Sequence, residues 1–169
     1  MLFFTTGNEK EKTYILSAKE AFEKFSDMVW RLALSKTGKR ELADDILQDV
    51  FMKYLSKSPK FYDENHCKAW LLRVTINCAN DLFKSGWFSK KAELTENIAD
   101  EQEFYSDVYS QVLKLPEKYR IVVHLHYYEG YSVKEISEIL KRNQSTIKTR
   151  LFRAREQLQQ LLKGEDFYV

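Results

Sequence analysis

The segment Asn143–Leu158, NQSTIKTRLFRAREQL, decides the fold of the C-terminal part of this 169-residue chain. Its apolar residues recur at helical spacing and form one stripe: Ile147, Leu151, Ala154 and Leu158. The opposite side is small, polar or cationic, and it includes the large ring of Phe152. Such a helix is either a solvated cationic surface with one stray aromatic ring or a helix that lies in a DNA major groove. In a groove, the cations would contact phosphates and the smaller side chains would meet base edges.

The residues just before this helix favour the DNA-binding interpretation. Ser132 and Glu135 have the spacing of a capping box, which marks a helix start, and a buried face follows over residues 133–140. Asn143 is a favoured N-cap for the basic helix. Two short helices joined by a tight turn, with the second one basic, predict a helix-turn-helix whose recognition helix comes last. Upstream, Pro116 predicts the start of a further amphipathic helix that ends at Gly130.

The composition excludes several classes of protein. A hydrophobic content of 44% and an aromatic content of 14% exclude wholesale disorder, and 5 Gly with 2 Pro suit helices joined by short loops. Cys67 and Cys78 match no metal or disulfide framework, which predicts a reducing, cytoplasmic location. No apolar run approaches membrane-spanning length, so we expect no membrane insertion. No cofactor motif is present.

The net charge of +2 hides a strong segregation of charge. Four acidic residues and no basic one lie in 41–49, whereas the cations of 66–91 face only Asp81. The segment 92–110 contains six acids and no base, and 141–155 contains six bases and no acid. Because DNA attracts local cationic patches, two patches on either side of an acidic segment predict two DNA contacts on two domains. The acidic segment is interpreted as a linker.

The N-terminal part is also expected to be helical. The first predicted helix ends at Gly38 and buries Phe22, Phe25, Val29 and Leu32. The second, ELADDILQDVFMKYLSK, buries Leu42, Ile46, Val50 and Tyr54. The third begins near His66 and combines apolar residues with Asn and cations. The predicted fold is therefore all-α, with two small helical domains joined by an acidic linker: 1–91, the linker 92–110, and 111–169 with the helix-turn-helix.

Four segments in order resemble the bacterial extracytoplasmic-function, or group IV, RNA polymerase sigma factors. They are ADDILQDVFMKYL, KAWLLRVTINCANDL, LPEKYRIVVHLHYYEGYSVKEISEIL and STIKTRLFRAREQL, which together span roughly Phe22 to Leu162. The resemblance implies an alternative sigma factor that binds core RNA polymerase and directs it to specific promoters of a stress or envelope-signal regulon. It implies no enzyme activity in this chain.

The resemblance also implies a role for each match. The helix with DDILQDVF would dock on the polymerase through Asp45, Gln48, Asp49 and Phe51, since acidic, hydrogen-bonding residues suit a basic partner. The third helix would recognise and help melt the minus-ten promoter element through Trp70, Arg73, Asn77, Asn80 and Lys84. The loop before it, KFYDENHC, would form a pocket for an extruded base. An ordinary polar helix face is the alternative interpretation of Asn77 and Asn80.

The basic C-terminal helix would recognise the minus-thirty-five element through Ser145, Thr146, Lys148, Thr149, Arg150, Phe152 and Arg153. The partners implied are core RNA polymerase, promoter DNA and a cognate anti-sigma factor, commonly membrane-anchored. Two features depart from the family. Lys141 and Arg142 stand where the turn commonly has Gly and an apolar residue, which predicts a left-handed lysine. Residues before Phe22 have no match.

Three other functions compete with this one. A dimeric repressor would own the same helix-turn-helix but would not explain DDILQDVF or the second basic helix. An enzyme would use Asp44, Asp45 and Asp49 for magnesium, or His124 with His126 for another metal, yet neither group shares one helix face. We expect the two histidines at the core edge or on the surface. A pure protein-interaction module is the third alternative.

Overall fold

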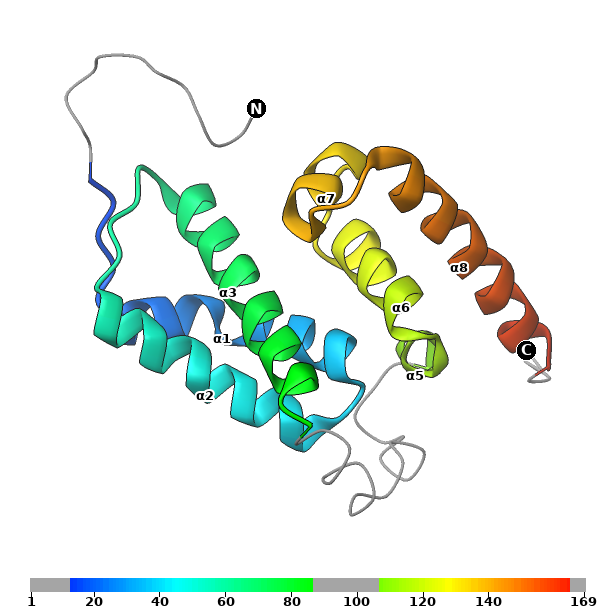
Figure 1. Cartoon of the computed structure of the whole chain (residues 1–169), viewed down its shortest axis with the longest axis horizontal. Helices are drawn as coiled ribbons and strands as arrows, with labels where there is room; N and C mark the ends of the chain where they lie inside the picture. The colour runs from blue at the N-terminus through cyan, green and yellow to red at the C-terminus, as the bar shows by residue number, and fades with distance from the viewer. Residues whose placement is uncertain (1–12, 87–106, 165–169) are drawn as a thin grey trace.

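The computed structural model describes residues 13–86 and 107–164. They form an all-α fold of two helical units that lie side by side (Figure 1). The N-terminal unit contains α1 (Ala18–Thr37), α2 (Arg40–Lys57) and α3 (Glu64–Lys84). The C-terminal unit contains α5 (Asp107–Lys114), α6 (Glu117–Val123), the π-helix η3 (His124–Tyr128), α7 (Val133–Leu140) and α8 (Gln144–Gly164). The last four residues of the linker predicted over 92–110 are thus helical, and the rest of it lies outside the described residues.

Helix α1 is fixed at both ends by local hydrogen bonds. The Ser17 hydroxyl accepts from the Glu20 N–H at 3.2 Å, and the Glu20 carboxylate accepts from the Ser17 N–H at 2.8 Å. At the other end Gly38 has φ 68°, and its N–H donates to the Leu34 carbonyl at 2.7 Å. Phe22 was predicted on the buried face but is 45% exposed. Its ring instead meets the edge of Phe51, with centroids 4.9 Å apart, because α2 crosses α1 at this point.

The other predicted core positions of the N-terminal unit are buried. Phe25, Val29 and Leu32 of α1 pack against Leu42, Ile46, Val50 and Tyr54 of α2 and against α3, and all seven are at most 4% exposed. Helix α3 begins after Asp63, whose carboxylate accepts from the His66 N–H at 2.8 Å. Leu71 and Leu72 are fully buried, whereas Trp70, Val74 and Leu82 are half-buried at the edge of the core. Burial of this apolar stripe holds the three helices together.

The helix predicted from Pro116 to Gly130 is present but changes geometry along its length. Pro116 is the N-cap of α6, and the last helical turns widen into the π-helix η3 before Gly130 at φ 74°. The π-helix places His124 inside, with no exposed surface, while His126 is half-buried and its Nδ1 lies 2.8 Å from the Tyr131 carbonyl. His124 therefore lies deeper than the core edge predicted for it.

The helix-turn-helix is formed by α7 and α8. The capping box predicted at Ser132 and Glu135 is present, with both backbone N–H groups bonded. Ile136 of α7 and Ile147 of α8 are fully buried against each other's helices. Lys141 ends α7 with φ 52° and ψ 49°, so the left-handed lysine predicted at this turn is confirmed.

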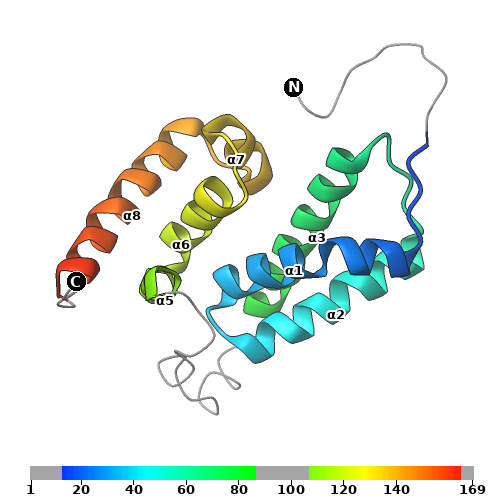
Figure 2. The same cartoon turned by 180° about the vertical axis from the view of Figure 1, so that it is seen from behind.

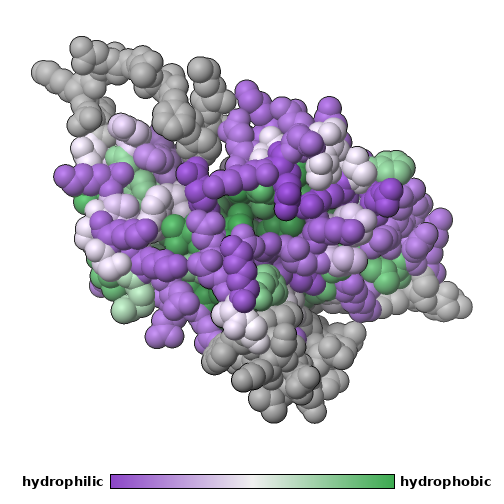
Figure 3. Space-filling model, in the orientation of Figure 1, coloured by the Kyte–Doolittle hydropathy of each residue, from purple (hydrophilic) through white to green (hydrophobic). Residues whose placement is uncertain are grey.

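The two units share one apolar core across the contact between α1 and α6, seen from both sides in Figures 1 and 2. A buried arginine on α6, Arg120, joins them. Its guanidinium donates to the carbonyls of Ser35 and Lys36 at the end of α1 and to those of Leu113 and Leu115 in its own unit. The surrounding face is largely hydrophilic, and apolar residues show between the two units (Figure 3).

The left-handed lysine gives a direct test of the turn. We expect Lys141→Gly to raise the free energy of unfolding by about 0.5–1 kcal/mol, because glycine adopts positive φ without steric cost. For a chain of this size that corresponds to a rise in Tm of roughly 1–4 °C. Glu138→Gly, at an exposed interior position of α7, is the matched control and should lower the Tm. Equal effects of the two substitutions would contradict the turn geometry.

Candidate nucleic-acid interface

The recognition helix α8 presents the side chains predicted for it on one exposed face. Asn143 caps the helix: its side-chain oxygen accepts from the Thr146 N–H at 2.8 Å and from the Ser145 hydroxyl at 3.0 Å. Of the seven residues predicted to contact DNA, Thr146 and Arg150 are half-buried at the edges of this face. The other five are exposed: Ser145, Lys148, Thr149, Phe152 and Arg153. The apolar stripe beneath packs on α6 and α7.

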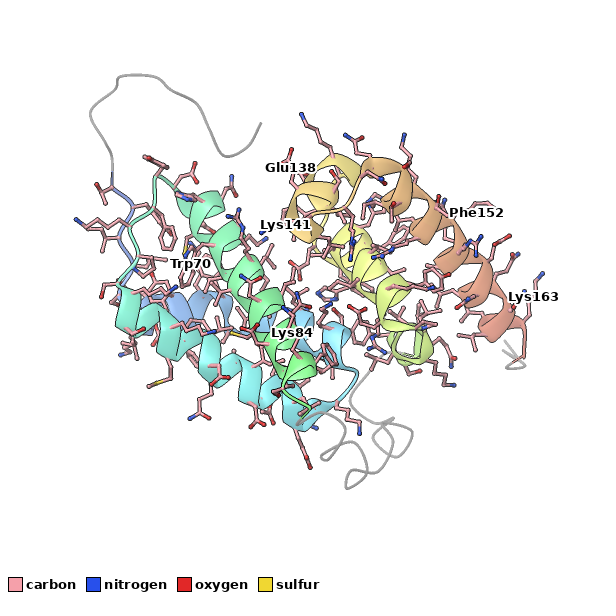
Figure 4. The ribbon with its side chains drawn as sticks, viewed as in Figure 1. Trp70, Lys84, Glu138, Lys141, Phe152 and Lys163 are labelled. Carbon is pink, nitrogen blue, oxygen red and sulfur yellow. The ribbon has the colours of Figure 1, made fainter. Side chains whose placement is uncertain are left out.

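Phe152 is the most unusual member of this face. Its ring is 56% exposed and projects from the side of α8 away from α6 (Figure 4). A large exposed ring among hydroxyls and cations is available to a partner, and burying it in a complex would be favourable. Apolar contact with a thymine methyl in a major groove would bury it. The face therefore combines hydroxyl, apolar and cationic groups, which are the types of side chain suited to base edges and phosphates.

Helix α3 carries a second face of polar and cationic residues. The five residues predicted to contact DNA there recur at spacings of three and four, so they lie along one side of the helix: Trp70, Arg73, Asn77, Asn80 and Lys84. Arg73, Asn77 and Lys84 are exposed, and Trp70 and Asn80 are half-buried. Figure 4 shows Trp70 and Lys84 toward the two ends of the helix. The face spans most of α3 and adjoins the loop before it.

That loop holds an aromatic pair that sequence analysis did not identify. The rings of Tyr62 and His66 are stacked, with centroids 5.1 Å apart and planes 14° apart. The Tyr62 N–H donates to His66 Nδ1 at 3.3 Å, and Tyr62 is 69% exposed. Below them, the buried ring of Phe61 meets the edges of His66 and Trp70. The exposed aromatic ring of Tyr62 beside a polar helix face is suited to stack a nucleic-acid base. The spacing of four residues across a helix cap was the available sequence signal.

The predicted docking residues of α2 do not all lie together. Gln48 and Asp49 are exposed and Asp45 is half-exposed, so these three share the outer face of the helix. Phe51 is 7% exposed and packs between Phe22 and Tyr54, beneath that face rather than on it. Met52, three residues after Asp49 and 59% exposed, completes the face in its place.

Two further side chains that could act as ligands or acids, Asp44 of α2 and Cys78 beside it, are instead paired within the fold. The Asp44 carboxylate accepts a hydrogen bond from the Trp30 indole at 2.7 Å. The buried Cys78 thiol lies 3.3 Å from the Lys53 ammonium, and burial raises its pKa despite that lysine. Burial likewise raises the pKa of Cys67 to about 11. Within residues 13–86 and 107–164, no cluster of three or more His, Cys, Asp or Glu side chains is arranged to hold a metal ion.

Two polar surfaces in one chain, one of them on a helix-turn-helix, are features expected of a nucleic-acid-binding protein. Comparisons with known proteins agree for both halves. Residues 21–88 match Sigma-70 region 2, and residues 106–158 match Sigma-70, region 4. RNA polymerase sigma factor SigZ of Bacillus subtilis (strain 168) is 30% identical over 159 residues, which cover 88% of this chain and 89% of that relative. ECF RNA polymerase sigma factor SigM of the same strain is 27% identical, with 86% and 95% covered.

Solved structures share the fold. The sigma factor RpoE from Bartonella quintana, in complex with the anti-sigma factor NepR, has a TM-score of 0.66 at 24% identity, with 87% of this chain and 97% of that chain covered. CnrH, in complex with the cytosolic domain of CnrY, has a TM-score of 0.61 at 23% identity, with 88% and 89% covered. The described helices include none that is long and apolar enough to span a membrane.

The chain belongs to the sigma-70 family of RNA polymerase sigma factors. Its relatives place it with the extracytoplasmic-function sigma factors. Members of the family are DNA-binding transcription initiation factors rather than enzymes, and they direct the polymerase to promoters.

The cap of the recognition helix provides a test of how this face is held. We expect Asn143→Ala to lower the free energy of unfolding by about 0.5–2 kcal/mol, because the Thr146 N–H loses its acceptor. Gln144→Ala, at the next position and exposed, should leave stability nearly unchanged. Urea denaturation followed by circular dichroism would measure both. Equal stabilities of the two variants would show that Asn143 is not the cap.

Proposed function

We propose that this chain is an alternative, group IV sigma factor that binds core RNA polymerase and directs it to the promoters of a stress or envelope-signal regulon. It would act in the cytoplasm, where the polymerase acts. The observation that carries the proposal is that three surfaces of different chemistry occur in one chain. They are an acidic face on α2, a polar face with an aromatic pair on α3 and its loop, and a basic face on α8. Each lies within the matching sigma-70 region.

The acidic face of α2 is suited to dock on the polymerase. Asp45, Gln48 and Asp49 offer carboxylate and amide groups at consecutive turns, and the exposed Met52 adds apolar contact beside them. Carboxylates pair strongly with arginine guanidinium groups, which form two parallel hydrogen bonds with each carboxylate. Phe51 would act indirectly, by filling the space beneath this face.

Helix α3 and its loop would recognise the minus-ten element as single-stranded DNA. Arg73 and Lys84 would contact phosphates, while the amides of Asn77 and Asn80 can donate and accept at a base edge. Extruding a base costs a few kcal/mol. Stacking on an aromatic ring returns roughly 1–3 kcal/mol per base, and the exposed Tyr62 ring on His66 provides such a surface. The loop pocket would in this way offset the cost of melting.

Helix α8 would recognise the minus-thirty-five element as duplex DNA in the major groove. Ser145, Thr149 and Arg153 would meet base edges, with Phe152 against a thymine methyl. Lys148 and Arg150 flank the face and would contact phosphates, with Thr146 at the helix start, where backbone N–H groups also favour anions. A cognate anti-sigma factor, commonly membrane-anchored in this family, would hold the protein inactive by covering these surfaces.

The recognition face can be tested with two arginines of the same helix. We expect Arg153→Ala to weaken binding to the minus-thirty-five element by about 1–3 kcal/mol and to relax base preference at one position. Arg155→Ala is the matched control, because Arg155 points to the Tyr127 hydroxyl, 3.4 Å away, and not to the recognition face. The measurement is binding of the polymerase–sigma complex to promoter fragments. An equal loss with both variants would contradict the assignment of the face.

The docking face can be tested by charge reversal. We expect Asp49→Lys to reduce affinity for core RNA polymerase at least about tenfold, because a lysine would face a basic partner. Asp27→Lys makes the same change on α1, where the Asp27 side chain is 90% exposed, and should bind normally. Affinity is measured by titrating labelled chain with core enzyme. Unchanged affinity of the Asp49 variant would place the docking surface elsewhere.

A further inference from the structure

The residues before α1 run alongside the loop that carries the aromatic pair. Tyr14 and Phe61 form an antiparallel bridge, in which the Tyr14 N–H donates to the Phe61 carbonyl at 2.6 Å and the Phe61 N–H returns a bond at 3.3 Å. Figures 1 and 2 both show these two segments side by side at the edge of the N-terminal unit. The match to Sigma-70 region 2 begins only at residue 21, so this segment lies outside it.

A second hydrogen bond ties the same segment to the core. The Tyr54 hydroxyl donates to the Leu16 carbonyl at 2.9 Å, and the Tyr54 side chain is 2% exposed. Its ring contacts those of Phe61 and Trp70, at centroid distances of 6.2 and 5.7 Å. Burial raises the pKa of Tyr54 to about 12, so the hydroxyl keeps its proton and remains a donor at neutral pH.

Two anchors, the Tyr14–Phe61 bridge and the Tyr54–Leu16 hydrogen bond, hold the chain beside Phe61, the residue that supports the aromatic pair. Phe61 directly precedes Tyr62 in the chain, and its ring meets the edge of His66 at 5.4 Å. Fixing the Phe61 backbone therefore fixes both the start of the exposed loop and the ring beneath His66. A stacking surface that is already in place spares the entropy of ordering it when a base arrives.

We propose that Tyr14–Leu16 is a positioning segment that holds the Tyr62–His66 pair and thereby sets base preference at the minus-ten element. The inference rests on the base-stacking role proposed for that pair. Tyr14 and Tyr54 are positioning residues, since neither would touch the DNA.

Selectivity among bases separates this role from a structural one. The holoenzyme made with each variant is titrated with single-stranded minus-ten oligonucleotides that carry each of the four bases at the extruded position. Tyr14→Pro removes the N–H donor and Tyr54→Phe removes only the hydroxyl. Each should reduce the ratio of best to worst base by roughly two- to fivefold, because a loop that is no longer held can adjust to a poorly fitting base, while affinity for core enzyme stays unchanged. Ile15→Ala trims an exposed side chain and leaves both anchors, so it should match the wild type.

Tyr62→Ala distinguishes the positioning role of Tyr14–Leu16 from the base-stacking role of the Tyr62–His66 pair. If Tyr62→Ala abolishes base selectivity while Tyr14→Pro and Tyr54→Phe retain it, the positioning role is overturned and the base pocket stands. If Tyr62→Ala itself leaves selectivity intact, the proposed role of the loop fails. Tyr54→Phe keeps the test decisive if Tyr14→Pro does not fold.

Discussion

The fit between Arg120 and the C-terminal end of α1 is the constraint that sets how the two halves of this molecule meet. The last carbonyls of a helix have no partner within the helix, and this end also carries a partial negative charge. Arg120 of the other unit brings both hydrogen-bond donors and a positive charge to this end. Its planar guanidinium donates to four carbonyls, two of them in α1. Gly38 makes the approach possible, because a Cβ there would lie 3.0 Å from the guanidinium. Burial lowers the pKa of Arg120, although arginine stays charged in proteins.

The polar faces of α3 and α8 each begin at a helix whose first turn is capped by a side chain. Asp63 caps α3 beside the aromatic pair, Ser132 and Glu135 cap α7, and Asn143 caps the recognition helix. Each cap fixes the first turn of its helix by bonding backbone N–H groups that have no partner within the helix. Cations and amides can then project from positions that packing on the opposite side has already fixed. Specific recognition by short helices depends on this kind of preorganisation.

Local chemistry explains which parts of this structure the sequence could predict. The capping box at Ser132, the cap at Asn143 and the left-handed Lys141 follow from residues within a few positions of each other, and all three are present. Apolar periodicity likewise identified the buried faces of α2 and α8. The exposure of Phe22 and the burial of Phe51 depend on how α1 and α2 cross, which periodicity within one helix does not determine.

Contacts between residues far apart in the chain could not be predicted from the sequence. The bond from Tyr54 to Leu16 and the bridge from Tyr14 to Phe61 join segments roughly 40 or more positions apart, and Arg120 contacts a helix end about 85 positions earlier. The π-helix at His124 is similar, since nothing in HLHYY distinguishes it from an ordinary helical turn.

Run-off transcription with purified core RNA polymerase and the wild-type chain tests the central claim most directly. Promoter-specific transcripts that appear only when both proteins are present are the predicted result. Specific DNA binding by the chain alone, with no initiation when core enzyme is added, would contradict it.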